Sequence, residues 1–169
     1  MGSRGANFRP KPGLLGQSIK ARFSLKLIAK YGFIGLPNAG KSSLLNELTN
    51  AKAQIGAYPF TTLEPNLGVL NGQIIADIPG LIEGASVGRG LGIKFLKHIE
   101  KVSLLFHCIA CDSSDVAKDY QNVTSELKKF GEHLVDKPEV IVLTKTDLVT
   151  PSVLKAHIKN LMKFNRKII

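Results

Sequence analysis

The stretch Gly35-Leu-Pro-Asn-Ala-Gly-Lys-Ser42 decides the fold, because it fits G-x-x-x-x-G-K-S/T between a predicted strand and a predicted helix. Its glycines let the backbone bend closely around an anion, with N–H groups pointing inward. The helix that begins near Lys41 adds the positive end of its dipole. The pattern predicts a loop for a magnesium-bound nucleoside triphosphate, with the Lys41 amine on the β- and γ-phosphates and the Ser42 hydroxyl on Mg²⁺. The residues expected to bind phosphate are Gly35, Leu36, Pro37, Asn38, Ala39, Gly40, Lys41 and Ser42.

Strands and helices alternate on both sides of this loop. Asn71-Gly72 lies inside the run 67–77 and is the strongest short hairpin signal in the chain. The alternation predicts an α/β fold of the P-loop type, with a mostly parallel sheet flanked by helices and ligands bound beyond the carboxyl ends of its strands. The predicted strands are 31–35, 103–110, 139–144 and the start of one at 167–169; a polar loop is expected at about 51–66; and the helices are 41–50, 91–101, 114–134 (with Asp112 or Ser113 as N-cap) and one from Pro151.

A second phosphate-site motif follows the hairpin. The strand that ends at Asp77 runs into D-x-x-G, formed by Asp77, Ile78, Pro79 and Gly80. A carboxylate at this place can hold the Mg²⁺ shell, and the Gly80 N–H can sense the γ-phosphate. Between the two motifs lies a Thr-containing loop, Phe60, Thr61, Thr62, Leu63 and Glu64. A Thr in such a loop can ligate Mg²⁺ only when the γ-phosphate is present, which predicts an order–disorder switch.

The base is predicted from the end of the strand 139–144. There, Thr144, Lys145, Thr146 and Asp147 form T-K-x-D. The Asp147 carboxylate can accept from both guanine N1–H and the N2 amino group, whereas adenine would leave that carboxylate unpaired. The Lys145 stem can lie over the base and ribose. We therefore expect GTP as the nucleotide.

Charge and composition limit the remaining possibilities. The net charge is +10 over 169 residues, and both 1–30 and 151–169 hold Lys and Arg but no acid. Basic ends on a near-neutral body indicate a polyanionic neighbour, with RNA favoured and solubility alone as the alternative. The chain shows no membrane-length apolar run and no secretion signal, so we expect a cytoplasmic protein. Cys108 and Cys111 are interpreted as core cysteines of a reducing compartment, and His107 as a packed strand residue.

These motifs together resemble the Obg family of translation-factor-class GTPases. The resemblance runs from about Phe23 to Ile169. Besides the phosphate loop, its most specific parts are Ala57-Tyr-Pro-Phe-Thr-Thr-Leu-Glu-Pro-Asn-Leu-Gly68, Asp77-Ile-Pro-Gly-Leu-Ile-Glu-Gly-Ala85 and Gly88-Arg-Gly-Leu-Gly-Ile-Lys-Phe-Leu-Lys-His-Ile-Glu100.

The resemblance implies a Ras-like G domain over 23–169, preceded by a basic Gly/Pro tail at 1–22. It implies Ser42 and Thr62 as Mg²⁺ ligands, 60–64 as the first switch, and a monomer that acts in assembly of the large ribosomal subunit beside its rRNA. Two departures stand out: Thr144 replaces the usual Asn, and the Ser-Ala guanine loop that should follow 167–169 is missing. We therefore expect a fragment of a longer G protein.

Hydrolysis would be in-line attack of water on the γ-phosphate, with Lys41, Thr62 and Gly80 as the catalytic groups. Leu81 stands where many G proteins place a water-orienting Gln, and Arg89 is the nearest candidate arginine finger. This predicts slow turnover, at or below ~10⁻³ s⁻¹. The alternatives are a P-loop kinase or ATPase, an RNA-binding module without significant hydrolysis, and an inert fragment.

Overall fold

The computed structural model describes residues 13, 16, 18–20, 29–49, 54–55, 66–78 and 101–169. Within them, strands form one seven-stranded sheet in the order β2-β3-β4-β1-β5-β6-β7. The strands are β1 Tyr31–Ile34, β2 Gln54–Ile55, β3 Asn66–Leu70, β4 Gln73–Asp77, β5 Leu104–Ala110, β6 Glu139–Thr144 and β7 Lys167–Ile168. The helices are α1 Lys41–Thr49, α3 Val116–Phe130, α4 Glu132–Val135, the 3₁₀ turn η1 Thr146–Leu148 and α5 Pro151–Met162.

The sheet is mostly parallel, as predicted. β1 lies at its centre and pairs in parallel with β4 and β5, and β5 continues the parallel pairing through β6 to β7. Only β2 and β3 are antiparallel to their neighbours. Because the carboxyl ends of β1, β4, β5 and β6 lie along one edge, the residues that follow these strands gather at that edge.

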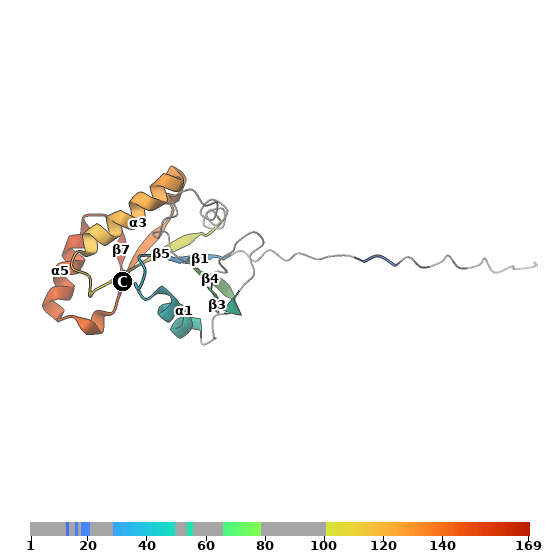
Figure 1. Cartoon of the computed structure of the whole chain (residues 1–169), viewed down its shortest axis with the longest axis horizontal. Coiled ribbons are helices and arrows are strands. Elements are labelled where there is room, and N and C mark those ends of the chain that lie inside the picture. The colour runs from blue at the N-terminus through green and yellow to red at the C-terminus, as the bar shows by residue number, and fades with distance from the viewer. Residues whose placement is uncertain are drawn as a thin grey trace, which may run out of the picture.

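Helices cover both faces of the sheet (Figure 1). On one face, Leu45 of α1 packs with Phe33, Ile75 and Cys108. On the other face, α3 packs against β5, and a further cluster joins it to α5. Strand β5 shows why both faces must be covered: alternate side chains point to opposite faces, and Leu105, Cys108 and Ile109 are all buried.

The predicted hairpin is present between β3 and β4. Both turn residues have positive φ, 50° at Asn71 and 74° at Gly72. This is the conformation that a two-residue hairpin loop requires and that Asn-Gly favours. The turn sets the register in which Asn66 pairs with Asp77, so it fixes where the carboxylate of the second motif lies.

Two predicted elements, the helix 114–134 and the loop 51–66, differ from the structure. The helix near residue 114 begins after Asp115, whose carboxylate accepts from the N–H groups of Ala117 and Lys118; neither Asp112 nor Ser113 is the cap. This helix ends at Gly131, and α4 follows it as a separate short helix. The expected loop at 51–66 contains strand β2, and residue 66 already belongs to β3.

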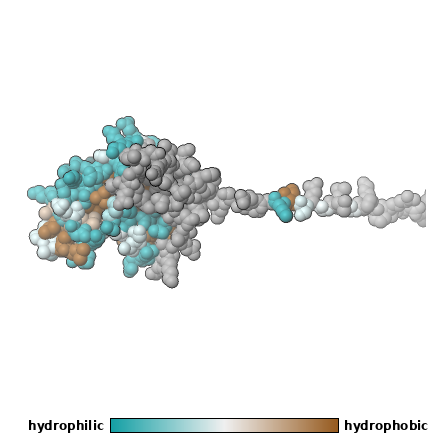
Figure 2. All heavy atoms as spheres, in the orientation of Figure 1, coloured by the Kyte–Doolittle hydropathy of each residue, from teal (hydrophilic) through white to brown (hydrophobic). Residues whose placement is uncertain are grey.

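The predicted helix at 91–101 lies outside the described residues apart from its last position. Over the part of the chain that the structure describes, no helix is long and apolar enough to cross a membrane. Hydrophilic residues cover much of the described surface in the view of Figure 2, and brown hydrophobic residues gather in the region where Figure 1 places α5.

Candidate functional site

The phosphate loop connects the end of β1 to the first residue of α1. Its backbone takes positive φ at Gly35, Asn38 and Gly40, with values of 144°, 61° and 80°. A Cβ at Gly35 would lie 2.3 Å from the carbonyl oxygen of Cys108, so only glycine lets the loop leave β1 this close to β5. The tight path brings the loop to the N-terminus of α1, as the motif predicts.

The Lys41 amine is folded back onto this loop. Its Nζ donates to the carbonyl oxygens of Gly35 at 3.0 Å and Leu36 at 2.9 Å, and the residue is buried. Burial lowers the pKa of Lys41, while the nearby charge of Asp77 acts in the opposite direction. A buried ammonium held by two neutral carbonyls lacks a full counter-charge, and a bound phosphate would supply one.

Ser42 and Asp77 meet beside the loop. The Ser42 hydroxyl donates to Oδ2 of Asp77, which joins the start of α1 to the end of β4. Asp77 is only 4% exposed, and its other oxygen, Oδ1, is buried with no hydrogen-bond partner among the described residues. A hydroxyl and a carboxylate with a free oxygen form a hard oxygen donor set, which fits Mg²⁺. When bound, that ion would neutralise charge on the phosphate oxygens.

The T-K-x-D residues contact the site through Thr144. The Thr144 hydroxyl lies 2.8 Å from the Ala39 carbonyl oxygen and 3.3 Å from that of Ile109. A strand 105 positions away in the sequence therefore holds the phosphate loop directly. The missing Asn of the motif is replaced by a side chain that still reaches the loop.

Lys145 and Asp147 lie just beyond Thr144. Lys145 takes a left-handed φ of 54°, and its Nζ is paired with Asp112 at 2.8 Å. Asp147 lies in the 3₁₀ turn and is exposed, so its carboxylate is accessible for a ligand. Thr146 precedes it in the same exposed turn.

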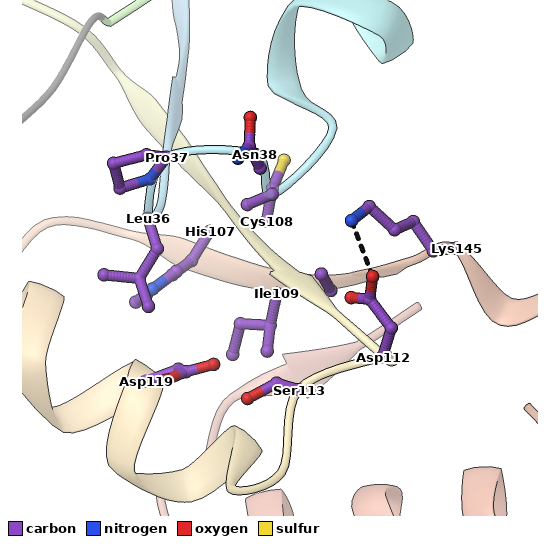
Figure 3. A pocket seen from close by; sticks show the side chains of 12 residues that line it. Leu36, Pro37, Asn38, His107, Cys108, Ile109, Asp112, Ser113, Asp119 and Lys145 are labelled. Carbon is purple, nitrogen blue, oxygen red and sulfur yellow. Dashed lines mark hydrogen bonds and ion pairs between the residues drawn. The ribbon is translucent and has the colours of Figure 1, made fainter. Parts of the chain in front are cut away.

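A cavity of about 320 Å³ separates the phosphate loop from Lys145 and the start of α3. Figure 3 shows Leu36, Pro37 and Asn38 on one side and the Lys145–Asp112 pair on the other. Asp147 does not line this cavity, whereas Lys145, two residues earlier in the chain, does. The predicted phosphate and base residues thus lie at one edge of the sheet but do not all share this cavity.

One predicted site residue lies in the core, and several others lie outside the described residues. Ile78 follows β4, and its side chain is buried in the core. Outside the described residues lie Phe60, Thr61, Thr62, Leu63, Glu64, Pro79 and Gly80, together with Leu81 and Arg89.

The cysteines are buried and free, in agreement with the sequence interpretation. Burial raises the pKa of Cys108 to about 12, against a smaller opposite effect of Lys41. The thiol is therefore neutral at physiological pH and serves as packing under the phosphate loop.

Sequence reasoning missed a polar network below the site. Glu139 accepts from Nδ1 of His107 at 2.7 Å and from the Tyr120 hydroxyl at 3.0 Å, and Nε of Arg166 lies 3.2 Å from it. Burial alone would raise the pKa of Glu139, but the hydrogen bond and charge of His107, with Tyr120 and Arg166, lower it. The sequence did contain a signal for this network, because Glu139 is a charged residue at the start of the mostly apolar strand β6.

The phosphate loop follows the central strand β1, a Ser–Asp pair lies beside this loop, and T-K-x-D begins at the last residue of β6, at the same edge of the sheet. Together these features define a P-loop nucleotide-binding domain with the Ras-like arrangement. A family model described as "50S ribosome-binding GTPase" matches residues 30–145. The chain belongs to this family, and the curated relatives to which it is similar are named GTPase Obg.

Those relatives are similar over most of the chain. It is 48% identical over 144 residues to GTPase Obg of Synechococcus sp. and 50% identical over 144 residues to GTPase Obg of Bacteroides fragilis, each match covering 82% of the chain. The chain covers only 42% and 37% of these two proteins.

Solved structures support the fold alone. An NFeoB mutant from S. thermophilus without nucleotide has a TM-score of 0.61 at 17% identity, covering 84% of this chain and 53% of that one. An Aquifex aeolicus Era mutant bound to GDP and AlF4⁻ has a TM-score of 0.59 at 24% identity, covering 82% and 49%.

Proposed function

We propose that the chain binds Mg²⁺ and GTP and hydrolyses the nucleotide slowly to GDP and phosphate, as a cytoplasmic monomer. The observation that supports this most directly is the convergence of two distant segments on one loop. Ser42 contacts Asp77, and Thr144 contacts Ala39, so the magnesium-side and base-side motifs are both anchored to the phosphate loop. The family membership reported above favours GTP as the substrate.

The described residues have defined parts in this reaction. The loop N–H groups and the Lys41 amine bind the β- and γ-phosphates and stabilise the charge that develops there. Ser42 and Asp77 hold the metal shell, and the exposed Asp147 reads the base. Thr62 and Gly80 would respond to the γ-phosphate in the same scheme.

Slow turnover follows from what stands at position 81. A Leu can neither donate to the attacking water nor accept from it, so the unassisted rate should be at or below ~10⁻³ s⁻¹. Measured release of phosphate by the isolated chain at several per second would contradict this. If the isolated chain binds GTP but releases no phosphate, the alternative is favoured, namely a nucleotide- and RNA-binding fragment.

We further propose a switch role in assembly of the large ribosomal subunit, with rRNA nearby. The family description and the net charge of +10 support this role. Co-sedimentation of the full chain with large-subunit particles in GTP and in GDP would test it. Equal sedimentation in both nucleotides would contradict a switch.

The base assignment is tested by Asp147→Asn. Displacement of a fluorescent guanine nucleotide by GTP, XTP and ATP is measured on the wild type and the variant. We expect the preference to move from guanine to xanthine, because the amide can donate to the xanthine oxygen where the carboxylate accepted from the guanine amine. Glu132→Gln, at a carboxylate 85% exposed on α4, is the matched control and should leave the preference unchanged. An unchanged base preference in Asp147→Asn would remove the proposed role.

A further inference from the structure

Three lysines form a row on the outer face of α5. Lys155, Lys159 and Lys163 follow one another at intervals of four residues, and all three are exposed. Lys163 is the C-cap and keeps helical dihedral angles, so the helical spacing extends to it. Residues four apart lie on the same helix face about 6 Å along the axis. We call these three residues the α5 lysine stripe.

Within the part of the chain that the structure describes, no acidic side chain pairs with the stripe. Among the described residues, none of the three lysines has a carboxylate within ion-pair distance. The segment 151–169 contains no acid at all. Arg166, which follows this helix, differs because it is paired with Glu139. The stripe is therefore a concentrated positive surface, available to an external anion.

Helix stability does not account for this arrangement. Like charges four residues apart oppose each other on a helix surface, so the row disfavours α5. The helix dipole favours cations only near the C-terminus, which accounts for Lys159 and Lys163 but not for Lys155 in the second turn. A row that weakens its own helix is better explained by a ligand than by folding.

The opposite face of α5 is already occupied. Leu161 is fully buried in a cluster with Ile109, Ile141 and Tyr120, and His157 lies 3.2 Å from the Cys111 carbonyl oxygen. This packing fixes the stripe on the outside of the domain. It also prevents the apolar face from entering a bilayer without undocking the helix, although Val153 and Met162 are exposed beside the stripe.

From these observations we infer that the α5 lysine stripe binds the phosphate backbone of RNA. Lysines supply point charges without bidentate base contacts, and the nearby aromatic ring of Phe164 packs at a tilt against Tyr120, so the contact should position RNA without reading its sequence. The inference rests on the RNA partner in the proposed function and adds the surface that would meet it.

The test measures fluorescence anisotropy of a labelled RNA hairpin against the full chain at several salt concentrations. The triple variant Lys155→Gln, Lys159→Gln, Lys163→Gln is compared with Lys101→Gln, Lys118→Gln, Lys129→Gln, which removes the same charge from exposed positions elsewhere. For the stripe variant we expect binding about tenfold to hundredfold weaker at ~0.1 M salt, with a slope of log K against log salt smaller by about 2. The control should lose less than about threefold.

Several outcomes would overturn the inference. Equal losses in both triple variants would show a general charge effect, and an unchanged salt slope in the stripe variant would remove the contact. Tighter binding to a DNA duplex than to RNA, or stripe-dependent binding to anionic vesicles but not to RNA, would assign the surface to another partner. GDP binding, measured separately, should be the same in wild type and both variants; its absence in all three would refute the proposed GTPase and leave the RNA result readable.

Discussion

The hydroxyl of Thr144 provides the sharpest test of how this site is held together. Its single proton can donate to one carbonyl at a time, and the 2.8 Å contact to Ala39 is better than the 3.3 Å contact to Ile109. Thr144→Val keeps the shape but removes the donor, leaving the carbonyl of the 3%-exposed Ala39 without it. Losing one partner of a buried hydrogen bond costs about 1–3 kcal/mol.

We expect this cost in two measurements. Urea unfolding of Thr144→Val should show a free energy of unfolding lower by about 1–3 kcal/mol. Because the same bond holds the phosphate loop, the Kd for GDP should rise by about fivefold to thirtyfold, equivalent to ~1–2 kcal/mol. Equilibrium titration with a fluorescent GDP analogue gives the second number.

Two controls separate loop anchoring from simple loss of a hydroxyl. Thr144→Ser keeps the donor and should bind GDP within about threefold of wild type, a change below ~1 kcal/mol. Thr124→Val removes a hydroxyl that bonds the Tyr120 carbonyl within α3, far from the loop, and should leave the Kd unchanged. A Thr144→Val protein with the wild-type Kd for GDP would refute the anchoring role.

Two further predictions concern the loop entry and the buried network. Gly35→Ala should lower the free energy of unfolding by about 3 kcal/mol or more, because its Cβ would lie 2.3 Å from a backbone oxygen and its φ is strained for alanine. The control Gly72→Ala has open space around its Cβ and should lower the free energy of unfolding by only about 1–2 kcal/mol. Equal losses for the two variants in chemical denaturation would contradict this. Glu139→Gln should lower the free energy of unfolding by about 1–3 kcal/mol at pH 7, because it removes the negative charge beside His107 and Arg166 and replaces one acceptor oxygen with an amide donor. The pKa of Glu139 is lowered from 4.5 in the folded state, so the Glu139 carboxylate stabilises the fold fully above pH 4.5, and this stabilisation is lost as the pH falls through the lowered pKa. If the difference in unfolding free energy between wild type and variant persists well below that pH, the charge of Glu139 is not its cause.

The sequence alone determined the local devices of this domain. Gly35 and Gly40 allow the loop its positive φ, Asn71-Gly72 closes the hairpin, and Pro151 begins the last helix, all as expected. Each of these depends on backbone sterics and turn chemistry within a few residues, which a single chain displays directly. The motif order along the strands also predicted which edge of the sheet carries the site.

The tertiary structure decided what meets across that edge. Strand order decides that Thr144 contacts Ala39 and that Glu139 pairs with His107 and Arg166. The distance between the end of β5 and the start of α3 decides that Asp115, not Asp112, caps that helix. Such contacts join residues far apart in the chain, or choose among equivalent neighbours. The packing of the sheet sets the distances between these groups, and each buried polar side chain hydrogen-bonds the partner that lies within reach.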